Sequence, residues 1–549
     1  MTSSTPSTPA TTSDPTPGTT AVATGGPSRR RVLGAGSAVG AGALLAACGG
    51  PTGGGDDTGS GGGGGGTEGV LTLGLNRSLV SLDNKLNQFD AAVTVQRAVR
   101  QGLTAIGDDL KPVMVLAESF EQTTDTQWTV KLREGIVYSD GTAVTVEDVA
   151  KALECYAPVE GSFVAQQFPE FPTLEKIDET SFTLTTQTPV VVLDSLMSNI
   201  LITPAAANKP EELQDGVGTG PYTVTNAESG TGSYTLEINE NYWGEEKPTV
   251  QTIEVRFMPE ESSRVVALRS GDVDVIDSVT ADSVAQLESV DDVEIESVDG
   301  TRFNQLFYNF RKPAGHPMAN PEVRKALTYA VDSASIVTGI MGDSVTSAKG
   351  VVPSTLEGAV DVGEFTYDPE MCKSELARLG VSDLALTIIW ENGEFAGDAS
   401  TMEALVEMFK AVGVTATLQQ FEPGGDIGTW RRGEAGDWDI LGNGYGNQTG
   451  LALTTIQGMY GGTPEKEATR DSYHGFVYPE IAAKISEAGA TSDEQARNGL
   501  LEEVQQMVWD TWPLLWAFVP KALLARRARV GGIELKPINS YDITTVTLD

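Results

Sequence analysis

The sequence has few of the residues from which enzymes commonly build active sites. Its 549 residues include only two histidines, His316 and His474, which leaves little material for a catalytic histidine or a His-rich metal site. We expect both to be ordinary loop residues. The motifs G-x-S-x-G, H-E-x-x-H, G-x-x-x-x-G-K-S/T and C-x-x-C are all absent. We therefore expect no enzymatic activity, no cofactor and no metal.

Basic residues are also scarce. The chain has 37 Lys and Arg residues against 76 Asp and Glu residues, a formal net charge of −39. Binding to nucleic acid requires a basic face, so nucleic acid is excluded as a partner. The excess of acid indicates a well-solvated, soluble surface, with a preference for cationic ligands as the alternative.

The sequence lacks an apolar run long enough for a permanent membrane span. Residues 1–27 are rich in Ser, Thr, Pro and Gly, and we expect them to be disordered. Arg29, Arg30 and Arg31 then precede an apolar run over 32–47, which is shorter than the roughly 20 residues that cross a bilayer. A charged segment before a short apolar segment is typical of a cleaved export signal, so we assign 1–47 to the signal and its extension.

Cys48 lies between this signal and a glycine-rich segment. Leu45-Ala46-Ala47-Cys48 resembles the lipobox of bacterial lipoproteins, which implies that Cys48 receives a diacylglyceryl group and becomes the new N-terminus. Residues 28–33 resemble a twin-arginine export motif, but Val32 replaces the usual aromatic residue, so the general secretory route stays open. Residues 48–67 would form the lipidated cysteine and a flexible tether spanning about 25 Å. We expect an extracytoplasmic protein anchored to the outer face of the cytoplasmic membrane.

The remaining 480 or so residues predict a large α/β body of more than one domain. Residues 70–75 alternate as a strand, and 128–156 predict a strand, a turn and a helix that begins with a capping box of Thr145 and Asp148. Helices are also expected to begin at Asn320-Pro321 and to end at Gly271.

Residues 384–421 contain the clearest unit of the sequence. A buried strand, a helix that ends at Gly413 and a second strand predict a right-handed β-α-β unit with parallel strands. Residues 437–445 predict the next strand. Ligands of open α/β sheets bind beyond the carboxyl ends of strands, so the segment that follows this strand is a candidate site.

Cys155 and Cys372 are the other two cysteines. They fall in different expected domains, so we expect no disulfide between them. Met371, Glu375 and Leu379 suggest a short amphipathic helix around Cys372, which we expect to be a buried thiol.

Several segments together resemble the large extracytoplasmic solute-binding proteins of ABC transporters (family 5), which bind peptides, oligopeptides and nickel chelates. The matching segments occur in order and carry the runs WTVKLREGIVYSDGTAVTVEDV (128–149), GTGPYTVTNAESGTGSYTLEINENYWGEEKP (218–248), VVALRSGDVDV (265–275), YNFRKPAGHPMANPEVRKALTYAVD (308–332), and the C-terminal pair VYPEIAAKISEA (477–488) and RNGLLEEVQQMVWDTWPLLWAFVP (497–520). Each match is modest, and together they cover about 120–520.

The resemblance implies a two-lobed, periplasmic-binding-protein-like (type II) α/β fold with an extra domain inserted in the first lobe. The first lobe would comprise 68–87, 197–300 and 520–549, the inserted domain 88–196 and the second lobe 301–519. Hinge strands near 300 and 520 would let the lobes close on a ligand.

The resemblance also places a ligand site after residue 440. In peptide binders of the family an aromatic residue and then an aspartate follow this strand, and the aspartate holds the ammonium group of the peptide. Tyr445 matches the aromatic residue, whereas the aspartate position falls near Gln448, beside Asn447 and close to Asn443. A neutral amide cannot supply a charge-assisted hydrogen bond, which favours a neutral polar ligand such as a sugar or a capped peptide.

Four further residues near the ends of the second-lobe strands are candidate contacts, with a place in the core or at the rim as the alternative. They are Trp390, Asn392, Phe421 and Trp430.

We interpret the chain as the lipid-anchored, monomeric substrate-binding component of an ABC importer. It would capture a peptide, sugar or metal chelate by lobe closure and deliver this solute to the permease subunits. The alternatives are a sensory or chaperone-like binding lipoprotein on the same fold and a secreted glycoside hydrolase that uses two carboxylates.

Overall fold

The computed structural model describes residues 69–77, 82–85, 90–159, 162–209, 216–228, 233–423 and 425–549. The predicted signal, Cys48 and the tether lie outside the described residues. Within the described ranges, no helix has the length and apolar character needed to cross a membrane.

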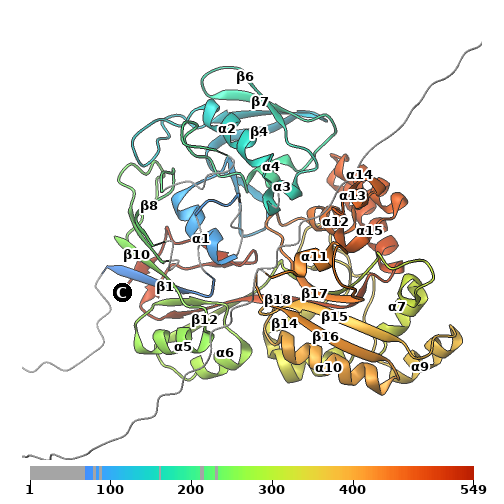
Figure 1. Ribbon diagram of the computed structural model, residues 1–549. Coiled ribbons are helices and arrows are strands. Elements are labelled where there is room, and N and C mark those ends of the chain that lie inside the picture. Colours follow the sequence, from blue (N-terminus) through green and yellow to red (C-terminus); the bar gives the residue numbers. More distant parts are fainter. Residues whose placement is uncertain are drawn as a thin grey trace, which may run out of the picture. The chain divides into compact units, whose positions relative to one another are not determined.

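A twelve-stranded sheet forms the framework of the body (Figure 1). Its strands are β1 (Val70–Leu75), β8 (Tyr222–Glu228), β9 (Ser233–Ile238), β10 (Thr252–Phe257), β11 (Val275–Asp277), β12 (Val293–Asp299), β13 (Phe303–Tyr308), β14 (Val345–Ser347), β15 (Ala385–Glu391), β16 (Thr415–Phe421), β17 (Ile440–Tyr445) and β18 (Leu514–Arg527). The order is β16-β15-β17-β13-β18-β11-β1-β10-β9-β8, and β12 and β14 also pair with β18.

Strand β18 belongs to both halves of this sheet. Its first residues pair with β13 and β14, for example Phe518 with Asn304, and its later residues pair with β11 and β12, for example Ala525 with Ile295. Strands β12 and β13 are consecutive, so the chain crosses between the halves twice, at 299–303 and 519–521. Both crossings lie where the sequence places the hinge strands.

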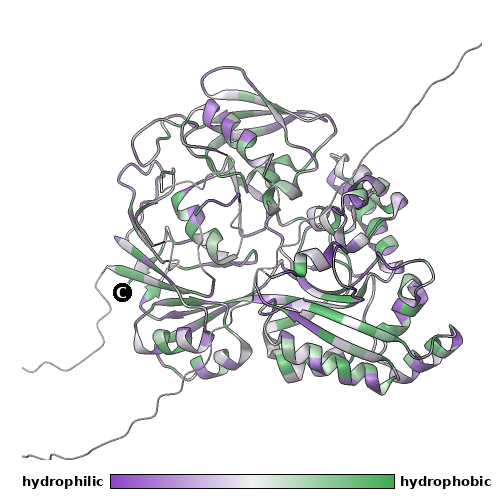
Figure 2. Ribbon diagram, viewed as in Figure 1, coloured by the Kyte–Doolittle hydropathy of each residue, from purple (hydrophilic) through white to green (hydrophobic). Residues whose placement is uncertain are grey.

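Helices cover both faces of the β13–β17 half of the sheet (Figure 1). Leu306 and Tyr308 of β13 share a core with the helices on one face, whereas Phe303 and Phe307 share another core with the helices on the opposite face. The first set is α7 (Pro321–Thr328), α9 (Pro369–Arg378) and α10 (Asp398–Ala411), and the second is α12 (Ala452–Tyr460), α14 (Pro479–Gly489) and α15 (Glu494–Asp510). Figure 2 shows hydrophobic stretches along the strands between the two sets.

The predicted β-α-β unit is confirmed. Strands β15 and β16 are parallel from Ala385 and Thr415 to Glu391 and Phe421, and α10 connects them. Gly413 follows α10 with a φ of +81°, a left-handed conformation that glycine adopts without steric cost. Strand β17 pairs in parallel with the other edge of β15.

The other half of the sheet centres on β1, which lies between the parallel strands β10 and β11. The strand predicted at 70–75 is thus confirmed. The helices of this region are α1 (Asp90–Val99), α5 (Glu261–Ser270) and α6 (Ala281–Leu287). Helix α5 ends at Gly271, which has a left-handed φ of +82°, as the sequence predicts.

A separate antiparallel sheet in the order β4-β5-β7-β6 lies within the expected inserted domain. Its region contains β2 (Thr104–Ile106), β3 (Pro112–Met114), β4 (Ala117–Thr124), β5 (Gln127–Leu132), α2 (Val146–Tyr156), α3 (Phe163–Gln167), β6 (Thr173–Lys176), β7 (Ser181–Thr185) and α4 (Leu193–Met197). The capping box of Thr145 and Asp148 is present at the start of α2. The boundaries of the three domains stay predictions.

Smaller elements complete the described chain. They are α8 (Ser333–Ile336), α11 (Ile427–Arg431), α13 (Pro464–Ala468), β19 (Val530–Gly531), β20 (Leu535–Lys536), β21 (Ser540–Tyr541) and β22 (Thr547–Leu548). Short turns of helix also occur at Pro317–Ala319, Val337–Met341, Gly342–Ser344 and Tyr473–Gly475.

Three local predictions need comment. Cys155 and Cys372 are buried and free, which confirms the absence of a disulfide between them. The short helix expected around Cys372 is confirmed as α9, and Cys372 is fully buried as predicted, whereas Met371 is 43% exposed. His474 is not an ordinary loop residue, since it lies buried in the turn Tyr473–Gly475 with a left-handed φ of +52°.

Candidate functional site

The loop after β17 is organised by Asn447. Its amide nitrogen donates to the carbonyl of Leu451 at 2.8 Å and to the hydroxyl of Thr455 at 2.8 Å, and its amide oxygen accepts the backbone N–H groups of Thr449 at 3.0 Å and Gly450 at 2.8 Å. The side chain is buried. Asn447 therefore shapes the turn into α12, and its amide is already used within the chain.

Gln448 points out of this loop toward the other half of the molecule. Its Nε2 donates to the carbonyl of Ile538 at 3.3 Å, in the C-terminal segment that the sequence assigns to the first lobe. Gln448 also lines a hollow described below. The predicted ligand loop thus reaches the first lobe through this residue.

Asn443 and Tyr445 belong to a buried polar and aromatic cluster. Asn443 accepts from Gln305 Nε2 at 3.1 Å and donates to the Tyr473 hydroxyl at 2.9 Å. The rings of Tyr445 and Tyr473 pack edge to face with centroids 5.7 Å apart. Burial raises the pKa of the Tyr445 phenol well above its usual range, so the group stays neutral at physiological pH. The sequence did not indicate Gln305 or Tyr473.

Trp390 and Asn392 occupy different environments at the end of β15. Trp390 is buried in the core beside α10, and its indole N–H has no hydrogen-bond partner among the described residues. Asn392 is exposed, and its backbone N–H donates to the carbonyl of Phe421 at 2.8 Å. Arg302, just before β13, forms an ion pair with Glu394, just after β15, at 2.6 Å. The sequence did not reveal this pair.

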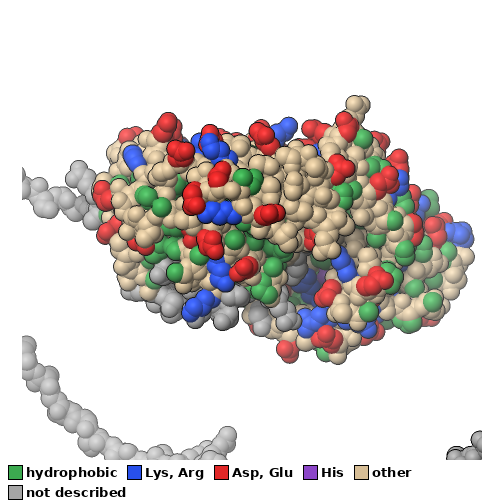
Figure 3. Space-filling view, turned by 90° about the horizontal axis from the view of Figure 1, so that it is seen from above, with side chains coloured by type: hydrophobic (Ala, Val, Ile, Leu, Met, Phe, Trp, Pro, Cys, Tyr) green, Lys and Arg blue, Asp and Glu red, His purple; other side chains and the backbone are tan. Residues whose placement is uncertain are grey.

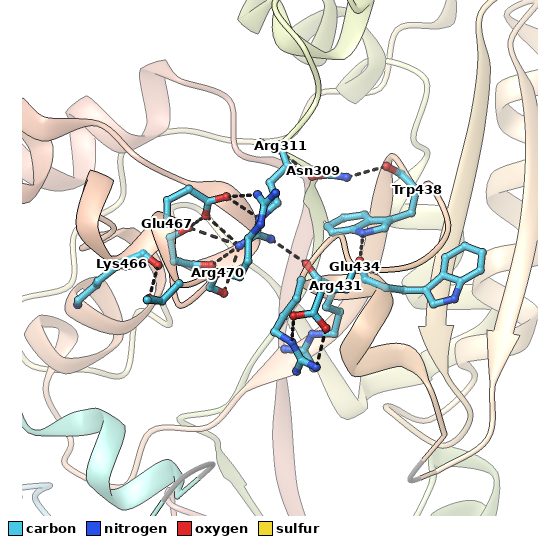
Figure 4. Close-up of polar contacts among 12 residues, drawn as sticks. Asn309, Arg311, Arg431, Glu434, Trp438, Lys466, Glu467 and Arg470 are labelled. Carbon is cyan, nitrogen blue, oxygen red and sulfur yellow. Dashed lines mark hydrogen bonds and ion pairs between the residues drawn. The ribbon is translucent and has the colours of Figure 1, made fainter. Parts of the chain in front are cut away.

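Phe421 and Trp430 contact each other with ring centroids 5.3 Å apart and pack on a small core around Trp438. The indole N–H of Trp438 donates to the carbonyl of Trp430 at 2.8 Å. The carbonyl of Trp438 in turn accepts from Asn309 at 2.9 Å (Figure 4). These two aromatic residues therefore hold the segment after β16 in place.

Arg311 fixes the same segment from the end of β13 (Figure 4). Its guanidinium donates to both carboxylate oxygens of Glu467, at 2.9 and 3.0 Å, and to the carbonyl of Arg431 at 2.7 Å. Burial alone would raise the pKa of Glu467, but hydrogen bonds from Arg311 and Ser472 outweigh this effect and hold that pKa below its usual range. The pair is a structural clamp.

A small hollow lies next to Gln448. Its wall combines the ends of α1, α3 and α4 with the ligand loop, through Asn84, Val93, Gln96, Arg97, Val164, Gln167, Ser198, Asn199, Leu201 and Gln448. Gln448 is the one predicted contact residue among these. The other seven lie elsewhere, and their role in ligand binding stays a prediction. Arg97 was not singled out from the sequence. Its position as the one charged residue in the run AAVTVQRAV was the signal that could have drawn attention to it.

A smaller hollow lies nearby and is lined in part by Asp83, Lys85 and Arg100. Lys85 and Asp83 form a buried ion pair at 3.2 Å. The described residues contain no cluster of three or more His, Cys, Asp or Glu side chains that could hold a metal ion. The space-filling view shows acidic and basic side chains mixed over one face, without a large basic patch (Figure 3).

A family model for bacterial extracellular solute-binding proteins, family 5, matches residues 111–467. The chain belongs to this family. It is 23% identical over 477 residues to a glutathione-binding protein, GsiB, from Shigella dysenteriae, a match that covers 84% of this chain and 92% of that protein.

Solved structures of other solute-binding proteins share the fold. An ABC transporter substrate-binding protein, CtaP, from Listeria monocytogenes has a TM-score of 0.75 at 20% identity, over 87% of this chain and 99% of that chain. A dipeptide-binding protein from Pseudoalteromonas sp. SM9913, in complex with Met-Leu, has a TM-score of 0.76 at 16% identity, over 87% of this chain and 100% of that chain. The expected type II periplasmic-binding-protein fold is therefore confirmed.

Membership of family 5 settles the class of the protein. It is an extracellular solute-binding protein of family 5, and it is a binding protein rather than an enzyme. The glycoside hydrolase alternative is thereby set aside.

Proposed function

We propose that this family 5 protein is a lipoprotein that captures a small solute by closing its two lobes and delivers it to its permease. The observation that carries the proposal is the double crossing at 299–303 and 519–521, where β12–β13 and β18 run side by side through both halves of the sheet. Two adjacent extended connections can bend together, which is the usual basis of hinge closure. Closure would shift the population toward a conformation that the permease recognises.

The solute would bind in the hollow beside Gln448. This position lies between the ligand loop after β17 and the α1, α3 and α4 region, so closure would bring both walls onto one molecule. Relatives whose names record binding of glutathione and of Met-Leu support a peptide or a related polar compound. The hydrogen bond from Gln448 to Ile538 supports a role for this amide at the junction.

Cys48 would anchor the protein. The support is the order of the basic segment, the apolar run and Leu45-Ala46-Ala47-Cys48 in the sequence. The glycine-rich tether over 49–67 would hold the body close to the membrane without fixing its orientation. The protein would act as a monomer.

Two measurements test this proposal on the full-length chain. Metabolic labelling with radioactive palmitate should mark the wild type and the control Cys155→Ala, but not Cys48→Ala, and only the unlabelled variant should leave the membrane fraction. Small-angle scattering should show a smaller radius of gyration when a peptide hydrolysate containing a bound component is added. Absence of label at Cys48 refutes the anchor, and absence of any solute-dependent change refutes lobe closure.

A further inference from the structure

Arg97 lies on the wall of the hollow with little to balance its charge. It lies in the last turn of the short helix α1, and its side chain is only partly exposed. Its guanidinium makes one long hydrogen bond, from Nη2 to Asn199 Oδ1 at 3.4 Å, and no carboxylate among the described residues pairs with it. Burial lowers the pKa of Arg97 to about 10, so the group is still charged at neutral pH.

Two other buried arginines, Arg324 and Arg264, have more hydrogen-bond partners than Arg97. Arg324 donates to the carbonyls of Met318, Thr511 and Trp512 at 2.5 to 3.0 Å. Arg264 donates to three carbonyls and lies 3.9 Å from Asp277. A desolvated charge without such partners is costly, so the position of Arg97 favours an anion supplied from outside.

The remainder of the wall suits an anion. Its polar residues are neutral amides and one serine, and its apolar part consists of Val93, Val164 and Leu201. Among the described residues, no acidic side chain lines this hollow. An anionic group that enters would therefore meet a cation and hydrogen-bonding amides without a like charge beside it.

We propose that Arg97 is the specificity-determining residue of the solute site, and that the solute is a small molecule with a carboxylate that Arg97 binds. The proposal rests on the solute-binding role above and names the class of solute. The planar guanidinium matches a carboxylate through two parallel hydrogen bonds. Gln448, which lines the same hollow, contacts a neutral polar group, so a free ammonium group on the solute is not required.

The test compares matched mixtures with the full-length protein. One pair is a casein hydrolysate and the same hydrolysate after methyl esterification, which removes the carboxylate charge. The other set contains glucose, glucuronate and glucose 6-phosphate. Native mass spectrometry identifies what the protein retains, and titration calorimetry on the retained compound gives its affinity.

Three variants make the outcome specific. Arg97→Gln keeps a donor for Asn199 and removes the charge, Arg97→Lys keeps the charge without the planar fork, and Arg269→Gln removes an exposed arginine of α5 as a control. We expect the wild type to retain acids and to bind their esterified or neutral counterparts at least ten-fold more weakly. Arg97→Gln should weaken binding by about 10- to 100-fold, Arg97→Lys less, and Arg269→Gln not at all.

Other results separate this inference from the proposed function. Retention of a neutral solute, or of an acid whose affinity is unchanged in Arg97→Gln, overturns the inference and leaves solute binding intact. If the protein retains only glucose 6-phosphate, the group that Arg97 binds is a phosphate, and the proposal that it binds a carboxylate is overturned. Retention of nothing by the wild type overturns both. Each variant is compared only if its unfolding midpoint matches that of the wild type.

Discussion

The hydroxyl of Thr301 donates to the carbonyl of Asn447 at 2.8 Å. Thr301 lies in the first crossing, between β12 and β13, and Asn447 lies in the ligand loop. The backbone N–H of Thr301 also donates to the carbonyl of Pro537 at 3.0 Å. One residue thus ties the first crossing to the loop after β17 and to the C-terminal segment that Gln448 contacts.

Thr301→Val should lower the free energy of unfolding by about 1 to 2 kcal/mol. Valine has nearly the same shape, but it leaves the buried Asn447 carbonyl without this donor. Urea unfolding followed by tryptophan fluorescence measures the change. Thr301→Ser retains the hydroxyl but lacks the methyl group, and it is the matched control. A loss in Thr301→Ser without a loss in Thr301→Val would show that the methyl group, and not the hydrogen bond, matters.

Gly300→Ala should lower the free energy of unfolding by about 1 to 3 kcal/mol, because overpacking displaces tightly packed backbone. A Cβ at Gly300 would lie 2.4 Å from the carbonyl oxygen of Pro520 in the second crossing. The two crossings would have to separate. Thermal unfolding provides the measurement, and Gly446→Ala is the control because a Cβ there meets nothing within 4 Å. If Gly300→Ala unfolds at the same temperature as the wild type, the two crossings are not closely packed in solution.

Glu467→Gln should lower stability by about 1 kcal/mol at pH 7, a value reduced by solvent screening. The folded-state pKa of Glu467 lies below its unfolded value. The stabilisation is therefore present above the unfolded pKa, about 4.3, and is lost as the pH falls through the folded pKa. The difference from the wild type should shrink at acid pH in urea titrations.

Glu434→Gln is the control for this clamp, since Glu434 forms an exposed pair with Arg432. It should unfold at the same urea concentration as the wild type. A difference between Glu467→Gln and the wild type that stays constant down to pH 3 would contradict the assigned pKa shift.

The local elements were predictable because short-range patterns determine them. The capping box at Thr145, the stop at Gly271 and the β-α-β unit that turns at Gly413 each depend on neighbouring residues. The exposure of Met371 could not be foreseen, because a short helix offers few apolar positions and packing with neighbouring elements decides which of them are buried.

The wall of the hollow could not be predicted in this way. Arg97, Asn199 and Gln448 come from three distant parts of the chain and meet only through tertiary packing. Alignment with a family motif pointed to the loop, but it could not tell that Asn447 shapes the turn whereas Gln448 faces the hollow. Side-chain direction in a loop depends on its own hydrogen bonds, which no sequence period encodes.

His474 should make stability depend on pH below about 6.5. Its ring packs against Phe307, Tyr473 and Trp438. Burial, together with the nearby charges of Arg431 and Arg311, lowers its pKa well below the usual value. The unfolded chain then binds one more proton than the folded chain once the pH falls below about 6.5, so the stabilisation from neutral His474 is present above this pH and declines below it.

The expected slope is about 1.4 kcal/mol per pH unit for this one group. In His474→Asn, asparagine tolerates the left-handed backbone and carries no titrating group. This variant should be less stable than the wild type. Its free energy of unfolding should also lack this contribution to the pH dependence between pH 6.5 and 5. His316→Gln, at a partly exposed loop position, should retain the slope. Urea unfolding at half-unit pH steps distinguishes the three proteins, and an identical slope in the wild type and His474→Asn would show that His474 is protonated in the folded state.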